Sequence, residues 1–326
     1  MQKVRIGIVG GAGYTGGELL RVLLRHPNAH IAFVHSTSNA GEPVSKVHAD
    51  LVGDTDLKFA SALSQDMDVL FLCVGHGDAQ NFLAANEINE NIKIIDLSQD
   101  FRLASTASMG NRNFVYGLPE LQRDKIKSAH HIANPGCFAT AIQLGLLPMA
   151  AKGLVNEVYT TGITGSTGAG QGLSSTSHFS WRANNIQAYK TLQHQHLNEI
   201  GESLAHLQGN QNAEVNFVSW RGDFTRGIFA TSVVATDLSL EAVYEMYHAY
   251  YDGHPFTHVS INNIDLKQVV NTNKCLIHIE KQGNKIAIHS VIDNLLKGAV
   301  GQAVQNMNLL FGLEEATGLQ LKANYF

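Results

Sequence analysis

The residue best suited to covalent chemistry is Cys137, which follows Asn134-Pro135-Gly136 and precedes the apolar run FATAIQLGLL. The tripeptide ends a predicted strand, and the apolar run is typical of a buried helix. Cys137 therefore stands at a helix N-terminus, where the dipole and free backbone N–H groups stabilise a thiolate nucleophile. The alternative is a buried cysteine that packs as a small apolar residue, which is the better interpretation for Cys73 and Cys275 within apolar strands.

A nucleophilic thiolate needs a proton donor, and the densest polar group that suits this role is His194-Gln195-His196 followed by Glu199. On a helix, His196 and Glu199 share one face, so the carboxylate could orient the imidazole for general acid catalysis. The sequence does not decide between His194 and His196, and a solvated helix start is an alternative. The two histidines also raise a metal site, but no third ligand follows at a suitable spacing, so we expect no metal.

A glycine-rich turn lies between the apolar strand 3–9 and a leucine-rich helix, and it contains the spacing G-x-G-x-x-G. Glycines let backbone N–H groups approach a pyrophosphate at the helix N-terminus, so this context predicts a dinucleotide site. The second strand ends in His35–Asn39 without the Asp or Glu that holds the ribose of NAD, which favours NADP. The turn consists of Gly10, Gly11, Ala12, Gly13, Tyr14, Thr15 and Gly16.

A second glycine-rich loop, TGSTGAG at 164–170, offers N–H groups and hydroxyls that could hold a phosphate or an oxyanion. By itself this loop is weak support for a site. Several arginines could bind phosphate or carboxylate in a bidentate manner, although a lone arginine is more often a surface charge. The sequence does not rank these candidates, which are Arg102, Arg182, Arg221 and Arg226.

The elements that must position these residues follow two different patterns. Short apolar strands at 31–36, 68–75, 91–98 and 130–136 alternate with helices, which predicts an α/β domain with a Rossmann-type, doubly wound parallel sheet. After residue 155 the strands are longer and alternate in polarity, as in AEVNFVSW, RGIFATSVVATD and the pair CLIHIEK and KIAIHSVID around Gln282-Gly283-Asn284. This indicates an α+β domain with a largely antiparallel sheet.

The domain prediction assigns residues 1–136 to an NADP-binding Rossmann domain, which the C-terminal helix 297–326 rejoins. Residues 137–296 form the catalytic and dimerisation domain. Helical spacing returns after Lys297, with apolar residues recurring on one face up to Phe311.

Composition sets the broad class of the protein. Apolar residues make up 44% of the 326 residues and charged residues 16%, which is typical of a soluble globular enzyme. The formal net charge of −5 and the lack of a Lys/Arg cluster argue against nucleic acid or an acidic membrane as partner. No signal-peptide pattern follows Met1 and no apolar run could span a bilayer, so we expect a cytoplasmic protein. The three cysteines are far apart and predict neither a disulfide framework nor a zinc knuckle.

Taken together, these motifs identify a resemblance that covers nearly the whole chain. The chain resembles the N-acetyl-gamma-glutamyl-phosphate reductase family of arginine biosynthesis, within the aspartate-semialdehyde dehydrogenase-like superfamily. The segments that carry the resemblance are GGAGYTGGELL at 10–20, DLSQDFRL at 96–103, YGLPEL at 116–121, ANPGCFATA at 133–141, GSTGAG at 165–170, HQHLNEI at 194–200 and DNLLKGAVGQAVQNMN at 293–308.

The resemblance implies an NADPH-dependent reduction of N-acetyl-gamma-glutamyl phosphate to the semialdehyde, with release of phosphate, through a thioester on Cys137. It implies His196 as acid and base, supported by Glu199 and Asn134. It further implies a homodimer or homotetramer. The turn 10–16, Ser36 and Ser38 are the implied cofactor contacts, with Asn294 near the nicotinamide; the implied substrate contacts are Arg102, Ser166, Thr167 and Gly168.

The chain departs from the family pattern in two places. Thr37 stands where relatives often carry Arg in the turn after the second strand. Ser219-Trp220-Arg221 replaces a Pro-His-Leu that many relatives have before the R-G-I strand. An indole and an added cation in the pocket wall would permit a larger or more acidic acyl group, such as succinyl in place of acetyl.

Two other hypotheses remain. One is the same chemistry on aspartyl phosphate, against which the HQHLNEI and NPGCFATA contexts argue. The other is a non-catalytic NADP-binding redox sensor, in which Cys137 is structural or responds to oxidation.

Overall fold

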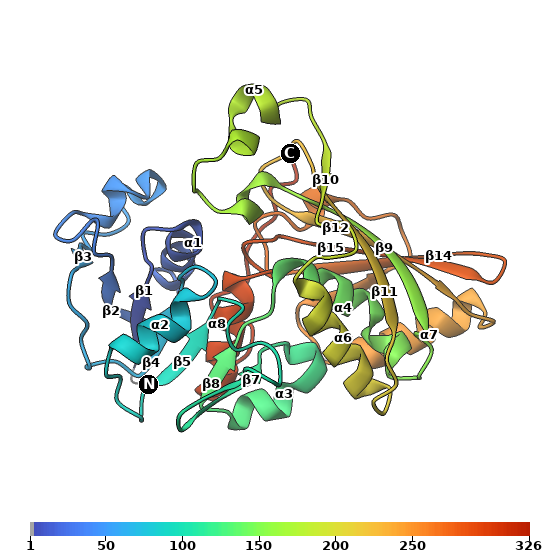
Figure 1. Ribbon diagram of the computed structural model, residues 1–326, viewed down its shortest axis with the longest axis horizontal. Helices are drawn as coiled ribbons and strands as arrows, with labels where there is room; N and C mark the ends of the chain where they lie inside the picture. The colour runs from blue at the N-terminus through green and yellow to red at the C-terminus, as the bar shows by residue number, and fades with distance from the viewer. Residues whose placement is uncertain (1–2) are drawn as a thin grey trace. The chain divides into compact units, whose positions relative to one another are not determined.

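The computed structural model describes residues 3–326 of the chain, which form two compact units. The first unit contains the chain up to Pro135 together with Ala299–Gln320. The second contains Gly136–Gly298 and Leu321–Phe326. Each unit has its own sheet and is described separately (Figure 1).

The first unit has an eight-stranded sheet in the order β3-β2-β1-β4-β5-β8-β7-β6. All its pairs are parallel except β6 with β7. The predicted doubly wound parallel sheet is therefore confirmed. The strands are β1 (Val4–Val9), β2 (Ala29–His35), β3 (Phe59–Ala60), β4 (Val69–Leu72), β5 (Lys93–Asp96), β6 (Ser108–Met109), β7 (Arg112–Tyr116) and β8 (His131–Ala133).

Local sequence explains why the first strand and helix form. β1 reads VRIGIV and is almost entirely buried between β2 and β4, as a central parallel strand requires. The helix α1 then buries the leucines of GELLRVL on one face. The helices of this unit are α1 (Tyr14–Leu23), α2 (Asp78–Ala85), α3 (Pro119–Ser128) and α8 (Val300–Leu310), with short 3-10 turns at Val44–Lys46 and Ala49–Leu51.

The last helix is shorter than the sequence analysis expected. α8 ends at Leu310 rather than continuing over 297–326, and Leu321–Phe326 belong to the second unit. Gly312, at a positive φ of 64°, follows the helix and ends it, as glycine does at a helix C-terminus. α8 contacts α1 and α3, and its buried amide Asn306 donates to the carbonyl of Gly117.

The second unit has a seven-stranded sheet in the order β10-β11-β9-β12-β15-β14-β13. β9 with β11 and β13 with β14 are parallel, and the other four pairs are antiparallel, so the largely antiparallel sheet is confirmed. The predicted hairpin turns at Gly283-Asn284, where Gln282 faces Lys285. The strands are β9 (Glu157–Thr164), β10 (Gln187–Tyr189), β11 (Glu214–Arg221), β12 (Ile228–Ala235), β13 (Thr257–Ser260), β14 (Cys275–Gln282) and β15 (Lys285–Ile292).

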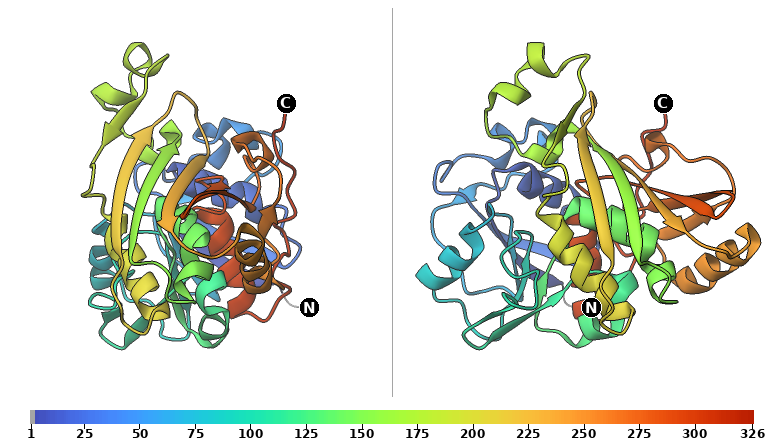
Figure 2. Two further views of the ribbon diagram at one scale, coloured as in Figure 1. Left: turned by 90° about the vertical axis from the view of Figure 1, so that its right-hand side faces the viewer. Right: turned by 45° about the vertical axis from the view of Figure 1, so that its right-hand side comes forward.

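Helices cover one face of this sheet. The first, α4, buries every residue after Cys137 and packs against β12, β15 and α6. A short helical segment with α5 extends beyond the edge strand β10, as both views in Figure 2 show. The helices are α4 (Cys137–Ala150), α5 (Phe179–Arg182), α6 (His196–Leu207) and α7 (Leu240–Tyr251), with 3-10 turns at Ser166–Ala169, Ser175–Ser177 and Leu266–Gln268.

Candidate active site

Cys137 is the first residue of α4 and is partly exposed, whereas the rest of the helix is buried. Gly136 precedes it in an extended conformation, with φ −70° and ψ 151°, and no side chain caps the helix. The first helical turn holds no acidic residue. The thiol therefore lies at the positive end of the helix dipole, where a thiolate is favoured.

The helix α6 brings His196 and Glu199 to the same helix start. The Glu199 carboxylate accepts a hydrogen bond from the Gly136 N–H at 3.1 Å, and its other oxygen lies 3.8 Å from His196 Nε2. A Cβ atom on Gly136 would lie 2.4 Å from His196 Nε2. Only glycine therefore lets the imidazole approach the backbone directly before Cys137.

His194 occupies a different environment from His196. Its ring packs at 5.5 Å from the ring of Phe138 and at 5.4 Å from that of Phe217, and its Nδ1 accepts the His196 backbone N–H at 3.2 Å. Burial, together with the charge of Lys190, lowers the pKa of His194 to about 4. This histidine is therefore neutral at physiological pH and orients the start of α6.

Beside these histidines lies Tyr189, the last residue of β10, whose ring is 5.8 Å from that of His194. Burial and the nearby Cys137 raise the pKa of the Tyr189 phenol, so it stays protonated. The Arg221 guanidinium lies over the Tyr189 ring, 4.8 Å from its centre. Sequence reasoning missed Tyr189 because no motif surrounds it, and it did not place Arg221 or its neighbour Arg182.

Backbone N–H groups of the loop 164–170, which the sequence analysis offered as phosphate donors, bond to other parts of the chain. The N–H groups of Ser166 and Thr167 donate to the carbonyls of Phe224 and Thr225, at 2.9 and 3.1 Å. The Thr167 hydroxyl also donates to Thr225, and the Gly168 N–H donates to Gly165. The chain itself therefore satisfies these three N–H groups.

Asn294 ties this loop to the start of β12. Its Oδ1 accepts the Gly227 N–H at 2.7 Å, and its Nδ2 donates to the Thr167 hydroxyl at 3.0 Å. Asn294 is buried in the second unit and has a clear structural role there.

The other two cysteines are packed as apolar residues. Both Cys73 and Cys275 are buried. Burial raises the pKa of the Cys73 thiol to about 12, so no thiolate forms at neutral pH. Cys137 is the only one of the three that is partly exposed and begins a helix.

In the first unit, the glycine turn has the geometry of an anion cradle. A Cβ on Gly10 would lie 2.3 Å from the Cys73 carbonyl oxygen, one on Gly11 would lie 2.2 Å from Val34, and one on Gly16 would lie 2.6 Å from the Gly11 backbone. By contrast, a Cβ on Gly13 would meet no atom closer than 3.7 Å. Gly13 is the N-cap of α1, which has neither a side-chain cap nor an acidic first turn. Three of these glycines therefore pack closely against the protein, whereas Gly13 leaves space at the helix start in which an anionic ligand could bind.

The carboxyl end of β2 carries only uncharged polar groups. Ser36 is buried, its hydroxyl lies 3.4 Å from that of Ser38, and Asn39 Nδ2 donates to both hydroxyls. No carboxylate stands in this turn, in agreement with the sequence.

Arg102 and Asn134 join two loops of the first unit. The Arg102 guanidinium donates to the carbonyls of Asn134 and Leu97, at 2.8 and 3.0 Å. Asn134 in turn donates to the carbonyl of Ala299 and accepts from Asn306. These contacts fix the backbone that leads into Pro135 and Cys137.

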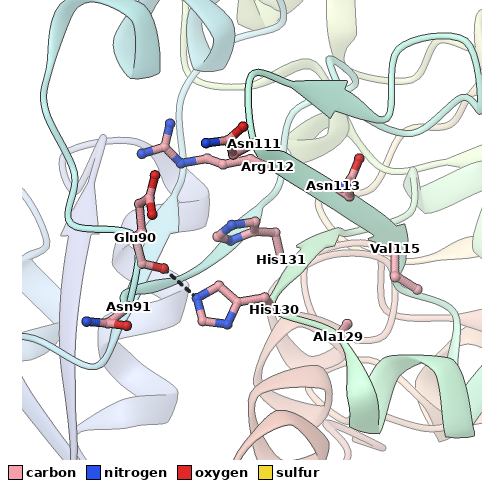
Figure 3. Close-up of a pocket in the computed structure, with 9 residues that line it drawn as sticks. All are labelled: Glu90, Asn91, Asn111, Arg112, Asn113, Val115, Ala129, His130 and His131. Carbon is pink, nitrogen blue, oxygen red and sulfur yellow. Dashed lines mark hydrogen bonds between the residues drawn. The ribbon is translucent and has the colours of Figure 1, made fainter.

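The first unit also has a surface pocket of about 720 Å³ at the amino ends of β7 and β8 (Figure 3). None of the predicted site residues lines it. One of its lining side chains is the buried His131, whose pKa is lowered to about 3 by burial and by the charges of His130, Arg112 and Lys93. In parallel α/β sheets, ligands bind at the opposite, carboxyl ends of the strands.

Residues 3–326, the part of the chain that the structure describes, lack two further features. No helix in this part of the chain is long and apolar enough to cross a membrane. No group of three or more His, Cys, Asp or Glu side chains there could hold a metal ion.

Comparison with known protein families separates the chain into two matched regions. Residues 5–129 match the semialdehyde dehydrogenase NAD-binding domain, and residues 137–294 match the semialdehyde dehydrogenase dimerisation domain. Relatives named N-acetyl-gamma-glutamyl-phosphate reductase are 56% identical in Bacteroides fragilis, 54% in Flavobacterium johnsoniae and 52% in Christiangramia forsetii. Each match covers 99% of this chain and 100% of the relative. This chain belongs to the N-acetyl-gamma-glutamyl-phosphate reductase family.

Solved structures support the fold at much lower identity. Aspartate semialdehyde dehydrogenase II from Vibrio cholerae, complexed with ASA, has a TM-score of 0.73 and 16% identity, over 96% of this chain and 99% of that one. The aspartate semialdehyde dehydrogenase with NADP from Candida albicans has a TM-score of 0.68 and 13% identity, over 95% and 99%. The resemblance of the sequence to this family and superfamily is thus confirmed.

Proposed function

We propose that this chain reduces N-acetyl-gamma-glutamyl phosphate to N-acetyl-glutamate semialdehyde, with release of phosphate, in arginine biosynthesis. The observation that carries this proposal is the group at the start of α4. There a partly exposed cysteine begins an uncapped helix, and a His–Glu pair contacts the preceding glycine. Relatives of this name, at 52–56% identity over the full chain, support the same activity.

The cofactor is NADP, held by the first unit. The fit rests on the cradle at Gly10–Gly16, whose packed glycines and open Gly13 suit a pyrophosphate at the start of α1. Ser36, Ser38 and Asn39 offer uncharged hydrogen bonds near the ribose and no carboxylate to repel a 2′-phosphate. Comparing kcat/KM for NADPH and NADH tests this, and Ser38→Asp should shift the ratio toward NADH.

Cys137 carries the covalent chemistry. Its thiolate attacks the gamma-carbonyl carbon, a carbon–sulfur bond forms, and the bond to the phosphate oxygen breaks, which leaves a thioester and free phosphate. Bound NADPH supplies the hydride that reduces the thioester carbonyl. The resulting thiohemiacetal on Cys137 then loses its carbon–sulfur bond, which releases the aldehyde and restores the thiolate.

His196 manages the proton during this sequence. It donates a proton to the thiohemiacetal oxygen as charge develops there and takes it back when the carbon–sulfur bond breaks. The Glu199 carboxylate, which also holds the Gly136 N–H, orients the imidazole. We assign this role to His196 rather than His194, because His194 is packed among aromatic rings and its Nδ1 already accepts a backbone N–H.

The other predicted site residues support the reaction by positioning the chain around Cys137 and the substrate. Arg102 and Asn134 position the backbone before Cys137. Ser166 can meet the substrate through its side chain, whereas Thr167 and Gly168 shape the loop through their bonds to Thr225 and Gly165. Asn294 holds the same loop. A homodimer or homotetramer is proposed from the dimerisation-domain match over residues 137–294.

The test is the reverse reaction. Purified protein is supplied with N-acetyl-glutamate semialdehyde and NADP, with and without phosphate, and formation of reduced cofactor is followed by absorbance. Phosphate-dependent reduction that is lost in Cys137→Ser and kept in Cys73→Ala supports the proposal. Activity only with aspartate semialdehyde would overturn the substrate. Activity with none of the semialdehydes, including the succinyl compound, would favour the redox sensor.

A further inference from the structure

His48 lies in the segment that connects β2 to β3, and its imidazole contacts the glycine turn before α1. The Nε2 atom of His48 lies 2.7 Å from the carbonyl oxygen of Gly11. A carbonyl oxygen only accepts hydrogen bonds, so Nε2 carries a proton and donates it to this bond. A side chain that is remote in sequence therefore holds the backbone of the turn.

Gly17, near the start of α1, makes room for this imidazole. A Cβ atom on Gly17 would lie 2.4 Å from Nδ1 of His48 and 2.5 Å from its Cε1. The φ angle of Gly17 is not positive, so the backbone conformation does not call for glycine. Glycine also destabilises a helix relative to alanine. The helix thus has a less stable residue at the position where the ring of His48 packs against it.

The bond from His48 fixes Gly11 from a second side. The N–H of Gly11 donates to the carbonyl of His35 at the end of β2, at 3.2 Å. A Cβ atom on Gly11 would lie 2.2 Å from Val34. The peptide group between Gly11 and Ala12 is planar, so holding its carbonyl also fixes the direction of the Ala12 N–H. The bond therefore sets the orientation of a backbone donor inside the turn.

The segment that carries His48 is itself held against the first unit. Val44 and Leu51 on either side of it are buried. The N–H of Val44 donates to the carbonyl of Leu57, and the N–H of His48 donates to that of Val44, both at 2.9 Å. The ring of His48 lies 6.4 Å from that of the buried Phe59 in β3. His48 therefore reaches Gly11 from a well-defined position.

We infer that His48 is a positioning residue for the cofactor: through the Gly11 carbonyl it holds the turn 10–16 in the conformation that receives a pyrophosphate. This inference rests on the proposed function, which places the pyrophosphate of NADP at this turn and the ribose at residues 36–39. His48 belongs to the same segment as residues 36–39, so it also ties the ribose turn to the pyrophosphate turn. A turn that is already ordered spares the ligand the entropic cost of ordering it.

The test measures the affinity for NADP directly, by calorimetric titration, and compares it with the kinetics of the reverse reaction. His48→Phe keeps an aromatic ring and removes the donor. The Kd and the KM for NADP should rise about three- to tenfold, which is the range of one neutral hydrogen bond. The kcat and the KM for the semialdehyde should stay within about twofold, because His48 acts on the cofactor site alone. The exposed His30→Phe is the control that changes none of these constants.

Two further variants separate positioning from general stability. In His48→Gln the side-chain amide can place a donor where the imidazole Nε2 lies, so the affinity for NADP should stay within about twofold of the native value. Gly17→Ala should weaken NADP binding as much as His48→Phe, because the methyl group displaces the ring. Its Tm should not fall, since alanine favours the helix. Combining Gly17→Ala with His48→Phe should add no further loss, because both changes remove the same bond.

Unchanged affinity for NADP in both His48→Phe and Gly17→Ala would overturn the inference. A fall in kcat together with a rise in both KM values and a lower Tm would also overturn it, because that pattern belongs to a purely structural residue. If His48→Phe does not fold, Gly17→Ala and His48→Gln decide by the same criteria. A native protein that binds no NADP would instead contradict the proposed function, whereas one that binds NADP no better than His48→Phe would contradict only this inference.

Discussion

Two strand-to-helix junctions of this chain have similar backbones and opposite surroundings. At the start of α1 the N-cap is Gly13, and at the start of α4 it is Gly136; both are extended, and neither helix has a side-chain cap or an acidic first turn. A Cβ on Gly13 would meet nothing within 3.7 Å, whereas one on Gly136 would meet His196 at 2.4 Å. We therefore propose that the same type of helix start binds the cofactor in one place and carries the reactive cysteine in the other.

The difference shows that the groups facing a helix N-terminus determine what it does. Free N–H groups with open space around them suit a large ligand whose charge they share. A helix start beside a thiol, an imidazole and a carboxylate suits one reacting atom. Substitutions at the two junctions should accordingly change different kinetic constants.

The largest effect is expected at the crowded junction from His196→Asn. This change removes the proton donor while the amide can still occupy the space beside Gly136. The kcat should fall about 10²- to 10⁴-fold, with KM for the semialdehyde little changed. Steady-state kinetics of the variant and the native protein checks this. A fall of less than about tenfold would contradict its role.

Gly136→Ala should have the next largest effect. The added methyl group forces His196 or Glu199 to move, so kcat should fall about 10²-fold, as misplacement of a catalytic group by about 1 Å can cause. A crystal structure of the variant should show the displaced imidazole. Unchanged kcat would mean that this close approach is not needed for catalysis.

Gly13→Ala is the matched change at the open junction. Its methyl group enters the space intended for the pyrophosphate but meets no protein atom closer than 3.7 Å. The KM for NADP should rise about three- to tenfold while kcat stays within about twofold. Assays of Gly13→Ala and Gly136→Ala in parallel compare the two junctions directly. If both variants changed the same kinetic constant, the proposed difference between the junctions would be wrong.

The sequence predicted much of this arrangement. The alternation of short strands and helices identified the parallel sheet, because each unit buries its apolar residues locally. Cys137 could be picked out because its position depends only on the neighbouring turn and helix. Gly136 could be placed in the turn before Cys137, but its need to be glycine arises from His196, which is sixty residues away in the chain, and no local sequence pattern predicts such a contact.

Two features of the candidate site could not be predicted for the same reason. The glycines of loop 164–170 look like an anion cradle, yet Phe224 and Thr225 accept their neighbours' N–H groups. Arg182 and Arg226 look alike in sequence, and only the fold pairs Arg226 with Asp293 and leaves Nε and Nη1 of Arg182 without a hydrogen-bond partner. Hydrogen-bond partners that are distant in sequence decide both cases.

The smallest expected effect concerns pH and stability. Burial lowers the pKa of His194 to about 4 and that of His131 to about 3. The unfolded chain binds these protons near pH 6.5, so stability should fall as pH decreases from about 6.5 to about 4, by at most about 1.4 kcal/mol per pH unit for each histidine. Above pH 6.5 both histidines are neutral in the folded and the unfolded protein, so they do not contribute to the pH dependence of stability.

Asp96 acts in the opposite direction, because burial raises its pKa to about 6 and favours its protonation in the folded state. His131→Asn should reduce the loss of stability that occurs as pH decreases. Unfolding by denaturant at pH 7, 6 and 5 would measure this. An unchanged slope would mean that His131 remains accessible to protons.

The central claim is the thioester on Cys137, and a single-turnover experiment without phosphate tests it most directly. The protein is mixed with N-acetyl- or N-succinyl-glutamate semialdehyde and excess NADP, and reduced cofactor and protein mass are measured together. We predict a burst of one reduced cofactor per active site and an acyl adduct on the Cys137 peptide, which added phosphate releases. An active protein with no adduct, or an adduct that persists in Cys137→Ala, would contradict the account.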